Sequence, residues 1–224
     1  MMMQKEREQI VEVGRLLYEK GLVQMSGGNI SIIDRKANLV AIKPSGALYI
    51  HMKPEDIIIV DMDGKVVEGE KHPSIETFMH LGLYKDHPDF QAVVHCHPLH
   101  AVAWSLQHSY LPSVIAAQWT INGAVKVAPY FGAGTPGLAQ SAVDAVGKDG
   151  FACILRAHGV IAGSPHDLFH AMEMCVTIED AAHIASICEA SGRGEMFTID
   201  RQLGEEGGYD GLEKVKRFSE DDCK

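Results

Sequence analysis

Apolar residues recur along the chain with two different periods, and the longer period predicts helices. Over residues 4–20 it places Ile10, Val13, Leu16 and Leu17 on one face, with Gly21 as the stop. The same spacing predicts four further helices, at 73–85, 98–107, 138–147 and 167–190. Ser164 or Asp167 is the expected cap of the last of these helices.

Short apolar runs between Gly, Pro, Asn and Asp residues predict strands. They cover 26–34, 38–46, 55–67 with a turn at Asp63-Gly64, 90–97, 124–129, and a hairpin at 151–164 that turns near His158-Gly159. Strands and helices are mixed but do not alternate strictly. The pattern therefore predicts one α/β domain over 1–224, with a central mixed or largely antiparallel sheet and helices on both faces. Its core covers about 7–190, and the tail 191–224 is polar with one helix near 211–218.

Charge and cysteine content narrow the functional classes. The net charge of −10 argues against nucleic-acid partners and anionic membrane surfaces, which both require clustered Lys and Arg. A small phosphorylated ligand remains compatible, because backbone N–H groups can hold it. Five cysteines without a C-x-x-C pair indicate reduced thiols and a cytoplasmic location. We find neither a signal-peptide pattern nor an apolar run long enough to span a membrane.

The stretch VVHCHPLH places two histidines at the end of an apolar strand. Residues i and i+2 of a strand share a face about 6–7 Å apart, so His95 and His97 point the same way and Cys96 points to the opposite face. Catalytic zinc usually has three protein ligands and one open position. His158, at another predicted strand end, is the best third ligand.

A structural role for these histidines is the alternative. The chain contains twelve histidines, so an H-x-H pair can arise by chance, and the pair alone favours neither interpretation. His100 is expected on a helix face or beside a ligand. The other eight histidines are expected to be structural or exposed.

Three clusters of small and polar residues suggest an anion site: Ser26-Gly27-Gly28-Asn29, Lys43-Pro44-Ser45-Gly46 and His72-Pro73-Ser74-Ile75-Glu76. Glycine-rich turns expose successive N–H groups, and a helix starting near Pro73 would add its first-turn amides. Such clusters are more often simple turns, and all three must converge in space to bind a phosphate. Glu76 is either a capping residue or, beside a metal ion, a general base.

Taken together, these motifs resemble the class II aldolase/adducin superfamily, and within it most closely the L-fuculose-1-phosphate aldolases, with the L-ribulose-5-phosphate 4-epimerases as a sister group. The similarity extends from Arg7 to about Ala190. It rests on S-G-G-N-I-S (26–31), K-P-S-G (43–46), P-S-I-E (73–76), V-H-C-H (94–97), A-P-Y (128–130) and A-H-G-V (157–160).

The resemblance assigns a role to each matching residue. It implies one zinc ion per subunit on His95, His97 and His158, and Glu76 as the catalytic acid–base, which also approaches the metal when substrate is absent. Epimerase relatives tend to carry Asp at this position, so the glutamate favours an aldolase. The implied phosphate-binding residues are Gly28, Asn29, Ser45, Gly46, Ser74 and Ile75.

Three positions depart from the family pattern. Ile75 replaces a serine of the usual P-S-S-E motif, which removes one hydroxyl donor to the phosphate. The family's central tyrosine has no counterpart in VIAAQWTING, and Phe218 stands where a C-terminal tyrosine is usual. These changes leave the zinc and enediolate chemistry intact and leave the aldehyde partner open.

The implied activity is zinc-dependent cleavage of a ketose 1-phosphate, such as L-fuculose 1-phosphate, to dihydroxyacetone phosphate and an aldehyde. The alternatives are a pentulose-phosphate 4-epimerase, an aldolase acting on another ketose such as a 5-deoxy- or methylthio-ribulose 1-phosphate, and a dehydratase or decarboxylase of the superfamily. A metal-free, adducin-like interaction domain is a fourth possibility, which the three histidines and Glu76 disfavour. The resemblance also implies a cytoplasmic homotetramer with active sites between subunits.

Overall fold

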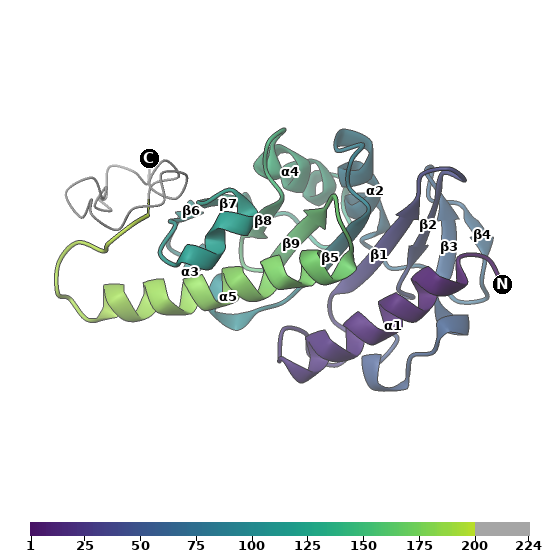
Figure 1. Cartoon of the computed structure of the whole chain (residues 1–224), viewed down its shortest axis with the longest axis horizontal. Helices are drawn as coiled ribbons and strands as arrows, with labels where there is room; N and C mark the ends of the chain where they lie inside the picture. Colours follow the sequence, from purple (N-terminus) through teal and green to yellow (C-terminus); the bar gives the residue numbers. More distant parts are fainter. Residues whose placement is uncertain (200–224) are drawn as a thin grey trace.

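The computed structural model of the chain describes residues 1–199, and these residues form one α/β domain (Figure 1). The helix expected near 211–218 and Phe218 lie outside the described residues. The helices are α1 (Gln4–Glu19), α2 (Thr77–Asp86), α3 (Leu99–Ser105), α4 (Pro136–Val146) and α5 (Leu168–Ala190). Short 3-10 helices lie at Tyr49–His51, Pro54–Asp56 and Ala116–Ile121. None of the helices within residues 1–199 combines the length and the apolar character that a membrane crossing requires.

A single mixed sheet forms the centre of the described domain. Its order is β4-β3-β2-β1-β5-β9-β8-β7-β6, and every neighbouring pair is antiparallel except β7 with β8. This confirms the predicted α/β class and the largely antiparallel sheet. The strands are β1 (Asn29–Asp34), β2 (Leu39–Ile42), β3 (Ile58–Asp61), β4 (Val66–Glu68), β5 (Ala92–Cys96), β6 (Tyr110–Leu111), β7 (Val125–Ala128), β8 (Ala152–Leu155) and β9 (Gly159–Ser164).

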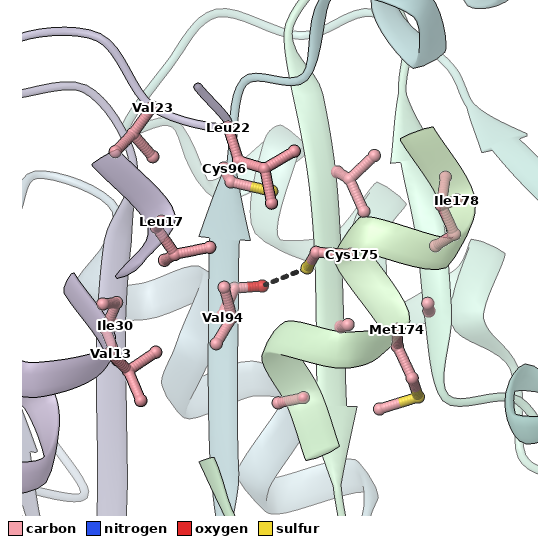
Figure 2. Close-up of a cluster of buried hydrophobic side chains, with 14 of the residues drawn as sticks. Val13, Leu17, Leu22, Val23, Ile30, Val94, Cys96, Met174, Cys175 and Ile178 are labelled. Atoms are coloured by element: carbon pink, nitrogen blue, oxygen red, sulfur yellow. Dashed lines mark hydrogen bonds between the residues drawn. The ribbon is translucent and has the colours of Figure 1, made fainter. Parts of the chain in front are cut away.

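Each face of the sheet has its own hydrophobic core. Helices α1, α3 and α5 cover one face, and α2 and α4 cover the other. Strand β5 contributes to both cores because its side chains alternate: Val94 and Cys96 join the α1/α5 core, and Val93 joins the α2/α4 core. Figure 2 shows Val94 and Cys96 among side chains of α1 and α5, with the Cys175 thiol directed at the Val94 carbonyl. The prediction that Cys96 faces away from the two histidines is therefore confirmed.

Two element boundaries refine the expectations from the sequence. The helix expected from Pro73 begins only at Thr77, with Glu76 at its N-cap. Pro73 instead forms an isolated antiparallel bridge with Pro44 in an extended segment. The prediction that this helix starts near Pro73 is therefore wrong, and the first-turn amides of α2 follow Glu76 instead. At α5, Asp167 is the N-cap, since its carboxylate accepts a hydrogen bond from the His170 amide at 2.8 Å.

The Asp167 cap can be tested by substitution. Asp167→Ala leaves the His170 amide without its acceptor, so we expect the free energy of unfolding to fall by about 1 kcal/mol. Asp180→Ala, an exposed change within the same helix, is the matched control and should alter stability by less than about 0.5 kcal/mol. Urea unfolding of the two variants measures this, and equal stabilities would contradict the assigned cap.

Candidate active site and metal centre

Three histidines from two separate parts of the chain meet at one end of strands β5 and β9. His95 lies in β5, His97 lies one residue beyond its end, and His158 lies in the β8–β9 turn. Their ligand nitrogens all fall within 4.8 Å of one another, and they form the one group of three or more metal-ligating side chains found within residues 1–199. The predicted trio of ligands is therefore brought together.

The nitrogen positions fit a shared metal ion. The Nε2 atoms of His95 and His97 are 3.0 Å apart, close to the roughly 3.3 Å expected between two nitrogens of one tetrahedral site. The His95 Nδ1–H donates to the Val160 carbonyl at 2.9 Å, which leaves the Nε2 lone pair free to bind a cation. This is the usual arrangement of a ligand histidine that a backbone carbonyl orients.

Glycines make the close approach of the strands possible. A Cβ on Gly159 would lie 2.1 Å from the Cys96 carbonyl oxygen and 2.9 Å from the His97 ring. Gly28 has φ +70°, and a Cβ there would lie 2.6 Å from the His95 carbonyl oxygen. The role of Gly159 is thus steric, because any side chain there would collide with β5 and with the His97 ring.

Glu76 completes the site from the α2 side. Its Oε2 accepts a hydrogen bond from the Asn29 side-chain amide at 2.7 Å and lies 3.3 Å from His95 Nε2. Its Oε1 lies 3.3 Å from His158 Nε2 but, among the described residues, has no hydrogen-bond partner although it is fully buried. A buried, unpartnered carboxylate oxygen facing imidazole nitrogens matches the needs of a divalent cation, so the donor set fits a metal ion.

Burial and charge shape the protonation states of this site. Burial, together with neighbouring His95 and His158, lowers the pKa of His97 to about 3. Burial and His95 also lower the pKa of His158. For Glu76, burial raises the pKa, but His95, Asn29 and His158 outweigh burial and hold it well below its usual range. The site thus favours neutral imidazoles at His97 and His158 and an ionised carboxylate at Glu76, the forms that bind metals.

The three clusters considered as an anion site do converge. The Lys43 ammonium donates to the Ser26 carbonyl at 3.0 Å, which joins the first cluster to the second. The Ser45 amide donates to the His72 carbonyl at 2.9 Å, and the Ser74 amide donates to the Lys43 carbonyl at 3.2 Å, which join the second to the third. These pairings occupy the Ser45 and Ser74 amides, so those two groups are not free for an anion.

Other groups of the clusters remain available. Within residues 1–199, neither the Gly46 amide nor the Ile75 amide donates to a backbone carbonyl. The Ser45 side chain and Gly46 are exposed, and the Ile75 side chain is 63% exposed. The Ser74 hydroxyl accepts from the Glu76 amide at 3.3 Å, which stabilises the start of α2. Gly28 is buried against β5, and its structural role is close packing.

Sequence reasoning missed one residue of this region, His80. It was grouped with the structural histidines, yet it is fully buried and contacts the Asn29 side chain through Nε2. A signal was present, since residue 80 is four positions after Glu76 and therefore shares its helix face. His100 is on a helix face as expected, where its ring contacts Glu179 at 2.7 Å and stacks on His183.

Gly159→Ala tests whether close strand approach controls metal binding. The added methyl group collides with the Cys96 carbonyl and the His97 ring, so we expect metal affinity to fall by about 10–100-fold. Gly132→Ala is the control, since its Cβ meets only the Thr135 methyl group at 3.6 Å. Competition with a chelator, read by metal analysis, measures both variants. Equal affinities in the two would contradict the steric role of Gly159.

The buried imidazoles should destabilise the metal-free fold in acid. Burial lowers the pKa of both His80 and His97 to about 3, whereas an unfolded histidine titrates near 6.5. Between these values the unfolded chain binds more protons, so the free energy of unfolding falls as pH decreases from about 6.5 toward 3. For His80, which is fully buried, the loss approaches about 1.4 kcal/mol per pH unit. Urea unfolding at several pH values measures the slope, which His80→Gln should reduce.

Comparison with known proteins identifies the family. The model of the class II aldolase and adducin N-terminal domain matches residues 8–186. A 5-deoxy-D-ribulose 1-phosphate aldolase of Bacillus thuringiensis serovar kurstaki is 38% identical over 200 residues, which cover 89% of this chain and 93% of that protein. An L-ribulose-5-phosphate 4-epimerase of Salmonella paratyphi B is 46% identical over 112 residues, 50% of this chain and 49% of that protein.

Solved structures agree with this assignment. An L-fuculose 1-phosphate aldolase superposes with a TM-score of 0.83 and 33% identity over 90% of this chain and 93% of that chain. The L-fuculose-1-phosphate aldolase of Thermus thermophilus has a TM-score of 0.73 and 29% identity over 83% of this chain and 95% of that chain. With its convergent histidines and buried glutamate, this chain belongs to the class II aldolase and adducin family and is a metal-dependent aldolase of that family.

Proposed function

We propose that this chain is a zinc-dependent aldolase that cleaves a ketose 1-phosphate, of the L-fuculose 1-phosphate kind, into dihydroxyacetone phosphate and an aldehyde. The observation that carries the proposal is the position of Glu76. Its carboxylate lies 3.3 Å from ligand nitrogens of both His95 and His158. An ionised carboxylate at the edge of a three-histidine centre is placed to move a proton on a substrate that the centre holds.

The residues that would hold the cation are His95, His97 and His158. Three neutral imidazoles and an open position are typical of catalytic zinc. Bound there, the cation supplies Lewis-acid stabilisation for the negative charge that develops on the substrate oxygens when the C–C bond breaks. The protein's part is to orient the ligands, which the hydrogen bond from His95 to the Val160 carbonyl does for one of them.

Glu76 is the proposed acid–base. In cleavage, the C–C bonding electrons stay on the carbon of the phosphate-bearing fragment, and the hydroxyl that becomes the aldehyde loses its proton. The carbon then gains a proton from the Glu76 carboxyl, which must first take one up, so the overall number of protons is unchanged. In condensation, the Glu76 carboxylate removes the same proton from dihydroxyacetone phosphate. Burial of Glu76, which is 5% exposed, keeps bulk water away from this transfer.

The convergent loops are the proposed phosphate site. Gly46 and Ile75 offer backbone amides, Ser45 and Ser74 offer hydroxyl groups, and Asn29 offers the second hydrogen of its side-chain amide. Asn29 contacts the Glu76 carboxylate directly, so a phosphate bound by these groups would place the adjacent carbons near that carboxylate. Ile75 supplies no side-chain donor, so its contribution is the amide alone.

The named relatives support a ketose 1-phosphate as substrate. The curated relative acts on 5-deoxy-D-ribulose 1-phosphate and the structural neighbour on L-fuculose 1-phosphate, according to their names. Both compounds yield dihydroxyacetone phosphate on cleavage and differ in the aldehyde. A screen of ketose 1-phosphates, with release of dihydroxyacetone phosphate as the signal, identifies the substrate, and release from none of them would refute the aldolase proposal.

A 4-epimerase is the second candidate. The 46% identity to an L-ribulose-5-phosphate 4-epimerase over half of each chain favours it. Glu76 disfavours it, since the epimerases that this sequence resembles tend to carry Asp there. Product analysis separates the two reactions, because an epimerase returns an isomeric pentulose phosphate and releases no dihydroxyacetone phosphate.

We also propose that the chain works in the cytoplasm as a single class II aldolase-like domain and assembles into a homotetramer with active sites between subunits. The tetramer follows from the family resemblance. Exposed apolar side chains on the helices, among them Leu99 and Ile187, provide surface for contacts between copies. Sedimentation equilibrium measures the assembly, and a monomer of 24.4 kDa would contradict the proposal.

Glu76→Gln tests the acid–base role. The amide keeps the shape of the side chain and cannot exchange the proton, so we expect cleavage to fall by about 10²–10⁴-fold with the metal retained. The chain provides a control in Glu173→Gln, an exposed change on α5 that should leave turnover unchanged. Turnover and metal content are measured on the same samples. Full activity of Glu76→Gln would remove Glu76 from the mechanism.

A further inference from the structure

A chain of hydrogen bonds runs through the buried space between β1 and α2 and ends at Glu76. The Tyr84 hydroxyl lies 2.8 Å from Ser31 Oγ, which lies 2.7 Å from His80 Nδ1. On its other side, His80 Nε2 lies 2.5 Å from Asn29 Oδ1. The Asn29 amide then donates to Glu76 Oε2 at 2.7 Å.

The donors in this chain all point toward Glu76. Asn29 Oδ1 can only accept, so His80 must donate to it from Nε2. A neutral imidazole that donates from Nε2 accepts at Nδ1, so the Ser31 hydroxyl donates to His80. Because the Ser31 proton is directed at His80, the Tyr84 hydroxyl is the donor to Ser31 Oγ at 2.8 Å, and it shares its proton with the Ser31 carbonyl at 3.0 Å.

The reverse arrangement is unfavourable. If His80 carried its proton on Nδ1, its bare Nε2 would require the Asn29 amide to turn around and donate to it. The Asn29 carbonyl oxygen would then take the place of the amide nitrogen, which now donates to the Glu76 carboxylate at 2.7 Å. Two acceptor oxygens at that separation in a buried site repel each other strongly. The tautomer of His80 and the direction of the Asn29 amide are thus tied to the charge on Glu76.

We propose that His80 is a positioning residue of the active site, whose Nε2–H holds the Asn29 amide in the one orientation that donates to the Glu76 carboxylate. Ser31 and Tyr84 in turn hold the His80 ring. His80 is 0% exposed, and burial lowers its pKa to about 3, which keeps the ring neutral. This role rests on the proposed function of Glu76, because a carboxylate moves a proton effectively only when its orientation is fixed.

Two substitutions of His80 distinguish a role in positioning Asn29 from a role in packing the core. In His80→Gln the side-chain amide can replace the Nε2–H donor, whereas His80→Leu fills a similar volume without any donor. The control Leu81→Ala weakens the same helix at a buried position of the α2/α4 core. The readouts are metal content, kcat, KM and exchange of the carbon-bound proton of dihydroxyacetone phosphate with deuterated water.

We expect His80→Leu to lose about 10–100-fold in kcat and in proton exchange while metal content stays that of the wild-type chain. His80→Gln should recover most of both rates, and Leu81→Ala should keep both within about threefold. The proposal is overturned if His80→Leu matches Leu81→Ala, or if His80→Gln is as slow as His80→Leu.

The tautomer gives a readout that does not depend on turnover. In metal-loaded protein with ¹⁵N-labelled histidine, the signal lost in His80→Gln identifies His80. We expect a neutral ring at pH 7 with the proton on Nε2, and a proton on Nδ1 would overturn the proposal. If the wild-type chain cleaves no ketose phosphate, the proposed function fails, and the tautomer still decides whether His80 orients Asn29.

Discussion

Pairing of β5 with β1 on one side and β9 on the other is the constraint on which the site depends. The register sets His95 opposite Asn29 of β1 and opposite Ile161 of β9. The ligand and the amide that contacts Glu76 therefore come from neighbouring strands held by backbone hydrogen bonds. Gly28 and Gly159 allow this packing, since a Cβ on either would collide with a β5 carbonyl. The position of His95 is consequently fixed by the sheet, and His97 and His158 directly adjoin the paired ends of β5 and β9.

Charge balance explains why the site suits a cation. Glu76 is buried and ionised. Among the described residues, one amide and two imidazoles are the only groups within hydrogen-bonding or ion-pair distance of its carboxylate. Burial favours the neutral form of two of the three imidazoles, so they supply little positive charge near pH 7. Only Oε1 of the carboxylate lacks a hydrogen-bond partner among the described residues. A divalent ion on the three histidines would add positive charge beside this buried carboxylate and use the free Oε1 electron pairs.

The sequence predicted features that depend on local period or spacing. The shared direction of His95 and His97, the opposite direction of Cys96 and the turn at His158 all follow from strand geometry. The sequence did not predict features that depend on pairing between distant segments of the chain. The late start of α2 at Thr77 results from the bridge between Pro73 and Pro44, which no local pattern reveals. The convergence of the three loop clusters and the contact of His80 with Asn29 escaped for the same reason, since each joins segments about 17 to 50 residues apart.

Buried and exposed residues of the candidate site differ in how freely they can change. The groups proposed to act on the phosphate-bearing fragment are the buried centre of histidines, Glu76, Asn29 and the loop amides beside them. Beside this centre, Ile75, which differs from the family pattern, is 63% exposed, and Tyr130 of the A-P-Y motif is 64% exposed. Relatives named for different ketose 1-phosphates share the fragment that becomes dihydroxyacetone phosphate and differ in the aldehyde. A rigid buried centre for the common fragment, with substitutable residues at its open side, allows one fold to serve several sugars, since exposed positions change at little cost in stability.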